Sequence, residues 1–193
     1  MNTPTHTLLA LAVLSKQGDR KRNIAVFIGS LIPDLAIYLW APYQYLVNGV
    51  SGKDMWGELY FQPQMQNLIA WFNSVPIYAL LALIGFKARS NFWGKMIFVF
   101  ALAALIHIAT DLPVHAEDAY RHFWPITDWR FYSPLSYWDS NHHSHWVSLF
   151  EAFLALGCVF ILWKRFPRIA VRVILFLSSL FYVAMLAAIL FIR

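Results

Sequence analysis

The chain has 193 residues, of which 60% are hydrophobic and only 13% are charged. Because soluble domains carry about 25% charged residues, this composition excludes an ordinary soluble protein and predicts one integral membrane domain over residues 1–193. The net charge of +5 lies mostly in short loops between apolar segments, which argues against binding of nucleic acid, and a single cysteine excludes an intrachain disulfide.

Six apolar segments in chain order predict an all-α fold, a polytopic helix bundle in the membrane. A helix needs about 20 apolar residues to cross the bilayer core, so the first segment is short, and we expect a half-length or tilted helix there. The segments cover residues 4–15, 24–41, 67–86, 96–115, 146–163 and 169–191.

The basic residues gather in three loops that alternate with these segments. Loops 16–22, 87–95 and 164–172 hold 11 of the 15 lysines and arginines. The positive-inside rule predicts that these loops are cytoplasmic, and we expect a bacterial inner membrane. Loops 42–66 and 116–145 and both termini would then lie on the opposite side, toward which the predicted site faces.

His107, Asp111 and His115 stand four residues apart at the end of an apolar segment. Ionisable side chains are expensive in a membrane and usually have a function there. On a helix, positions i and i+4 share a face, so His107 and Asp111 can bind one ion. Since Pro113 kinks or ends a helix, His115 can turn back toward this ion or serve a second one. The alternative is three polar groups that are satisfied within a helix bundle.

Three other segments carry an ionisable side chain at the depth of His107. Counted from the basic end of each segment at 1.5 Å per residue, His6, Asp34 and Glu151 also lie roughly 15–20 Å into the membrane. Side chains that share one inward-facing site must lie at the same depth. Such a site is needed because lipid does not compensate the cost of burying charge. We therefore predict that His6 and Asp34 join the metal site. The open alternatives are an interfacial His6 and a Glu151 that hydrogen-bonds a neighbouring helix.

Residues 121–139 are dense in Trp, Tyr and Phe, whose rings prefer the headgroup level of a membrane. This density predicts an interfacial belt or a re-entrant lid. We expect Arg121, His122 and Arg130 to contact the anionic head of a lipid or other amphiphilic substrate. Plain anchoring in the membrane is the alternative.

The order of these elements resembles a known family. An early His6, a G-x-x-x-P-D element that ends at Asp34, and the H-x-x-x-D-x-x-x-H element at 107–115 are similar to the YdjM-like group of membrane-bound metal-dependent hydrolases. The last element also resembles one in soluble zinc-dependent phospholipase C enzymes. The resemblance implies a metal-dependent hydrolase, acting on phosphate esters or lipids.

Histidine and carboxylate ligands without a thiolate suit Zn²⁺, Mn²⁺ or Fe²⁺, and Zn²⁺ is the choice on ligand type. The number of ions stays open. Asp111 or Glu151 would act as general base beside a metal-activated water. Two other classes of function also remain open. A transporter can use buried acids and histidines as an ion or proton path, and a membrane scaffold can use the same cluster as a structural metal site.

Overall fold

The computed structural model describes residues 1–191, and these residues contain helices and no strand. The predicted all-α bundle is confirmed, with five helical stretches long and apolar enough to cross a membrane. The helices are α1 (Thr3–Leu14), α2 (Arg20–Leu46), α3 (Gly52–Gly57), α4 (Pro63–Phe72), α5 (Val75–Lys87), α6 (Phe92–Asp111), α7 (Ser144–Arg165) and α8 (Ile169–Phe191). Short 3-10 turns cover Leu59–Phe61, Leu112–Val114 and Ser140–His142.

The predicted segment 67–86 is two helices, α4 and α5, which meet at Asn73 and Ser74. Pro76 has no backbone N–H with which to continue the preceding helix, and the Ser74 hydroxyl caps α5 by accepting from the Ile77 N–H at 3.2 Å. The Asn73 amide donates across the bundle to the Pro33 carbonyl of α2 at 2.9 Å. The break in the segment therefore ties α4 to α2.

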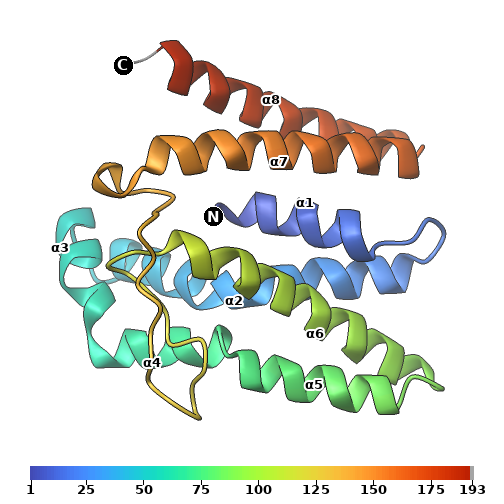
Figure 1. The fold of residues 1–193 in the computed structure, drawn as a ribbon, viewed down its shortest axis with the longest axis horizontal. Coiled ribbons are helices and arrows are strands. Elements are labelled where there is room, and N and C mark those ends of the chain that lie inside the picture. The colour runs from blue at the N-terminus through green and yellow to red at the C-terminus, as the bar shows by residue number, and fades with distance from the viewer. Residues whose placement is uncertain (192–193) are drawn as a thin grey trace.

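Helix α1 lies at the centre of the bundle and contacts α2, α6 and α7 (Figure 1). The outer helices α5 and α8 pack on α6 and α7, respectively. Because α1 has 12 residues while α2, α6 and α7 have 27, 20 and 22, it runs along only part of their length. The expected short first helix is thus confirmed, and its N-terminal end lies inside the bundle.

The three basic loops lie together at one end of the bundle (Figure 1). Lys21 sits 4.7 Å from the centre of the Phe92 ring, and Arg165 donates to the Ser15 carbonyl at 3.1 Å. Helix α3 and the segment 116–143 lie at the opposite end. The two sets of loops therefore separate as the charge pattern predicts, while their cytoplasmic or external side stays a prediction.

Helices α2 and α6 are in close backbone contact at Gly29. A Cβ atom on this residue would lie 2.2 Å from the Phe100 carbonyl oxygen, so only glycine fits there. The close contact brings the following turns of α2, with Pro33 and Asp34, alongside the half of α6 that carries His107. Gly29 thus positions the two sides of the candidate site.

Candidate metal centre

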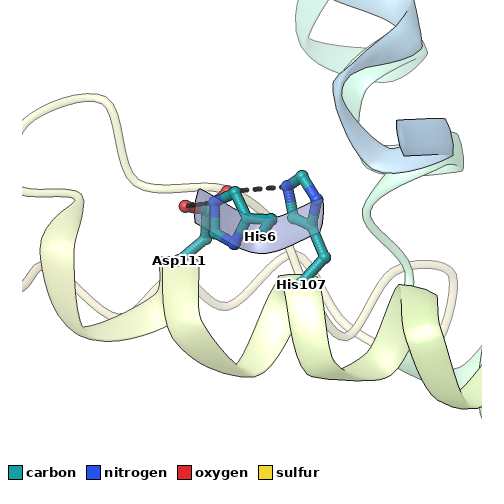
Figure 2. A group of neighbouring side chains, drawn as sticks. All are labelled: His6, His107 and Asp111. Carbon is teal, nitrogen blue, oxygen red and sulfur yellow. Dashed lines mark ion pairs between the residues drawn. The ribbon is translucent and has the colours of Figure 1, made fainter. Parts of the chain in front are cut away.

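His6, His107 and Asp111 form a buried group between α1 and α6 (Figure 2). His6 Nε2 lies 2.9 Å from Asp111 Oδ1, and His107 Nε2 lies 3.2 Å from Asp111 Oδ2. The two imidazole rings stack with their centroids 3.7 Å apart. Ligands of a tetrahedral ion with bonds of about 2.1 Å are about 3.4 Å apart. One ligand atom from each residue lies within 4.8 Å of the others, so the group could hold a metal ion.

His115 and Asp34 extend this group on two sides. Helix α6 ends at Asp111, and a 3-10 turn with Pro113 follows, which brings His115 Nε2 to 3.5 Å from Asp111 Oδ1. Asp34 Oδ1 lies 3.4 Å from His107 Nε2, and Asp111 Oδ1 also lies 2.6 Å from the Met1 amino nitrogen. The structure thus brings His6, Asp34, His107 and Asp111 together, with His115 beside them. Metal binding by these five residues stays a prediction.

Hydrogen bonds fix the orientation of the two central imidazole rings. His107 Nδ1 donates to the Ser30 carbonyl at 2.7 Å. His6 Nδ1 lies 2.8 Å from Thr110 Oγ1, and the Thr110 hydroxyl donates its own proton to a backbone carbonyl of α6. A neutral ring with its proton on Nδ1 would direct the lone pair of Nε2 into the site, as in histidines that bind metals.

The Nε2 atoms of His6 and His107 have no hydrogen-bond partner among residues 1–191. The Asp111 oxygens lie 2.9 Å and 3.2 Å from these nitrogens, as ion-pair contacts. Because leaving a buried polar group without a partner costs about 1–3 kcal/mol, two such atoms that face one carboxylate require an explanation. An ion bound by Asp111 would give both nitrogens a partner.

Asp118 supports His115 from the far side of its ring. Its Oδ2 atom lies 2.8 Å from His115 Nδ1 and accepts from the Trp138 indole at 3.0 Å. Burial lowers the pKa of His115, but the Asp111 and Asp118 carboxylates outweigh burial and raise the pKa to about 9. Burial raises the pKa of Asp118, but its hydrogen bond with His115 outweighs burial and lowers the pKa. A carboxylate behind an imidazole is a common second partner in metal sites.

Glu151 is not brought into this group. It is fully buried, and its Oε1 atom accepts from the Asn2 N–H at 2.8 Å and from the Thr5 hydroxyl at 2.6 Å. Thr5 Oγ1 also lies 2.6 Å from the Tyr182 hydroxyl of α8. Glu151 thus serves the N-terminal end of α1 and ties it to α7 and α8. Glu151 is buried because it joins neighbouring helices, not because it lies beside Asp111. This is the alternative that the sequence leaves open.

A cavity of about 540 Å³ opens onto the group between α1, α2 and α3. Asp34, Asp111 and His115 form its polar wall. Its other wall is largely apolar and aromatic and includes Ile37, Leu46, Met55, Trp56, Tyr120 and Tyr137.

Arg121, His122 and Arg130 do not line this cavity. Arg121 pairs with the exposed Asp128 at 2.8 Å, and Arg130 donates to Gln66 at 3.0 Å. His122 is buried, with Nδ1 3.2 Å from a backbone carbonyl. These contacts hold the segment 116–143 in place. The positions of the three residues therefore do not support the expected contact with substrate. The aromatic residues of this segment that line the cavity are Tyr120 and Tyr137.

Comparisons with protein-family models, curated proteins and solved structures find no match to this chain. Function is therefore inferred from the buried group, its hydrogen bonds and its cavity, and the resemblance to YdjM-like hydrolases stays a prediction from the sequence.

Proposed function

We propose that this protein is a membrane-embedded, metal-dependent hydrolase of phosphoesters in a lipid or other amphiphile. The observation that carries the proposal is the pair of unpartnered Nε2 atoms on His6 and His107, which face Asp111 while both Nδ1 atoms are engaged. Imidazole and carboxylate ligands without a thiolate favour Zn²⁺. Asp34 and His115 are close enough to add further ligands.

The cavity favours an enzyme over a scaffold with a structural metal. Structural zinc sites are closed by four protein ligands, while catalytic sites keep a position open for water or substrate. Asp111 lines the cavity together with Asp34 and His115, so a water molecule can reach an ion held by Asp111, His6 and His107. A site of this kind supports hydrolysis.

A bound divalent metal would lower the pKa of a water ligand toward neutrality and polarise a phosphoryl oxygen. Asp34 lies in the cavity wall and accepts from the Thr3 hydroxyl, where it can take the proton of the attacking water. The water oxygen would bond to phosphorus while the phosphorus–oxygen bond to the alcohol breaks, and the proton held by Asp34 would pass to the departing alcohol oxygen. Asp111 would act as the carboxylate ligand that holds the metal ion.

The lining of the cavity supports an amphiphile as substrate. Apolar residues such as Ile37 and Leu46 lie beside the carboxylates, and both belong to α2, one of the helices that can cross a membrane. A phosphate group can therefore approach the ion while an attached hydrocarbon chain lies against α2. A small, fully charged phosphoester would gain nothing from this wall.

The test compares wild type with Asp111→Asn, which keeps the side-chain shape and removes the charge. Protein purified in a mild detergent is assayed for bound metals by elemental analysis and for turnover of long-chain and short-chain phosphodiesters. Asp111→Asn should lose the metal and reduce turnover more than about 100-fold, since loss of a mere supporting residue already costs 10–100-fold. Asp128→Asn, which changes an exposed acid outside the cavity, should behave as wild type.

Two outcomes would overturn the proposal. The first is a wild-type protein without bound metal, which favours the scaffold. The second is an Asp111→Asn variant that binds metal and turns over substrate as well as wild type. Zn²⁺ or proton flux in liposomes, in the absence of any turnover, would instead support the transporter.

A further inference from the structure

A second cavity of about 910 Å³ lies between α1, α2 and α8. Its walls are mainly aliphatic and aromatic side chains from these three helices, among them Leu8, Leu11, Phe27, Leu31 and Ile174. Helix α1 forms the floor because it is shorter than α2 and packs between α2 and α7. We refer to this cavity as the α1 groove.

Positive charge marks one end of the α1 groove. Arg20 at the start of α2 and Arg168 just before α8 line this end and are exposed. Neither forms an ion pair with any residue from 1 to 191, and no acidic residue in that part of the chain lines the groove. Two uncompensated guanidinium groups at the mouth of an apolar groove provide a site for an anionic headgroup.

We propose that the α1 groove binds an anionic phospholipid from the leaflet that meets the basic loops. Its phosphate lies between Arg20 and Arg168, and one acyl chain follows α1 toward Pro4 and Tyr38 at the other end. The 12 residues of α1 rise about 18 Å. Half of the hydrocarbon core measures about 15 Å, so the groove is long enough for a chain from one leaflet.

The distribution of charge distinguishes this lipid from a substrate of the metal centre. The cationic end of the groove lies with the basic loops, at the ends of α1 and α8 far from Asp111, while the end near the metal centre is formed by Thr3, Pro4 and Tyr38. The Tyr38 hydroxyl donates to Thr3 at 2.9 Å, and Thr3 donates to Asp34. The lipid chain therefore ends against a hydrogen-bonded wall of the metal centre, and the proposal holds whether or not the protein is an enzyme.

Native mass spectrometry of the full chain tests this proposal. Protein released from detergent micelles with equal amounts of phosphatidylglycerol and phosphatidylcholine should retain mainly phosphatidylglycerol. Arg20→Gln with Arg168→Gln should weaken retention about 30-fold, which is about 2 kcal/mol for two basic residues. Lys87→Gln with Arg89→Gln removes two charges from the same end of the bundle, outside the groove, and should retain phosphatidylglycerol as wild type does.

Two further measurements distinguish binding in the α1 groove from a general attraction of basic residues to anions. Leu31→Trp adds bulk to the apolar wall and leaves both arginines in place, so it should also reduce retention. Glycerol phosphate, which has the charged head without chains, should not compete with the lipid. The proposal is wrong if wild type retains the two lipids equally, or if the Arg20 and Arg168 double variant retains phosphatidylglycerol as well as the Lys87 and Arg89 variant.

Discussion

At the scale of single residues, the candidate centre depends on hydrogen-bond partners that orient its histidines but are not proposed as ligands. The Ser30 carbonyl, the Thr110 hydroxyl and the Asp118 carboxylate each engage the Nδ1 atom of one histidine. These contacts hold each ring in one orientation, so the geometry of the candidate centre depends on them.

Thr110→Val should weaken metal binding although Thr110 is not a proposed ligand. Valine has nearly the same shape but cannot accept from His6 Nδ1, so the ring loses its orientation. Loss of such a supporting partner costs 10–100-fold in metal affinity, which competition with a zinc chelator can measure. Thr127→Val, at an exposed position of the segment 116–143, is the control. Equal affinities in the two variants would show that Thr110 does not orient His6.

Glu151→Gln should leave the metal content unchanged, since Glu151 serves Asn2 and Thr5 rather than the centre. The amide oxygen can still accept from both donors, but its NH₂ group replaces an oxygen that has no partner within residues 1–191. We expect a loss of about 1–3 kcal/mol in unfolding free energy with turnover close to that of wild type. A folded, metal-loaded Glu151→Gln protein without turnover would restore Glu151 as the general base.

At the scale of helices, the metal group depends on the contact between α2 and α6. The two backbones are in close contact at Gly29, and Pro33 follows one turn later on α2. Proline lacks the N–H that a regular helix would use, and nearby backbone carbonyls accept from other helices: Ser30 from His107 and Pro33 from Asn73. A backbone carbonyl of α2, that of Ser30, therefore supplies an acceptor to the site.

Gly29→Ala should separate α2 from α6 and impair the centre. A Cβ atom 2.2 Å from the Phe100 carbonyl forces a backbone shift, and such overpacking costs about 1–3 kcal/mol. Gly157→Ala is the matched control, because a Cβ atom there meets nothing within 4 Å and alanine favours a helix. Thermal unfolding in detergent and zinc content measure both effects. If the two alanine variants retain equal stability and zinc, the α2–α6 contact does not hold the site.

Part of this structure is predictable from the sequence, and the reason differs between elements. Long apolar runs predict the spanning helices because burial of some 20 apolar residues outweighs local preferences. The break at Asn73 and the short helix α3 within loop 42–66 are not predicted, since each depends on capping or contacts with distant segments.

Within the site, too, some features are predictable from the sequence and others are not. The spacing of His107, Asp111 and His115 and the matched depth of His6 and Asp34 predict which residues meet. Depth alone does not tell which face of a helix a side chain occupies, so it also selects Glu151. A backbone carbonyl such as that of Ser30 has no signature in the sequence. Asp118 has a weak signature in its spacing of three from His115.

At the scale of the whole molecule, the arrangement of loops predicts from which side of the membrane the cavity beside the metal centre is accessible. In a Cys158→Ala background, Ser90→Cys lies among the basic loops and Ser140→Cys at the opposite end, and both positions are exposed. A membrane-impermeant maleimide should label Ser140→Cys in intact cells and Ser90→Cys only after permeabilisation, because basic loops stay cytoplasmic. The reverse labelling would place the cavity on the cytoplasmic side.

Insertion into a bilayer is harder for α1 than for the long helices. Its 12 residues fall short of the roughly 20 that a helix needs to cross the hydrocarbon core by itself. It is held at its depth by α2, α6 and α7, which are synthesised after it. His6 therefore meets Asp111 only when these later helices are in the membrane, so α1 reaches its final place only after helices that follow it in the chain.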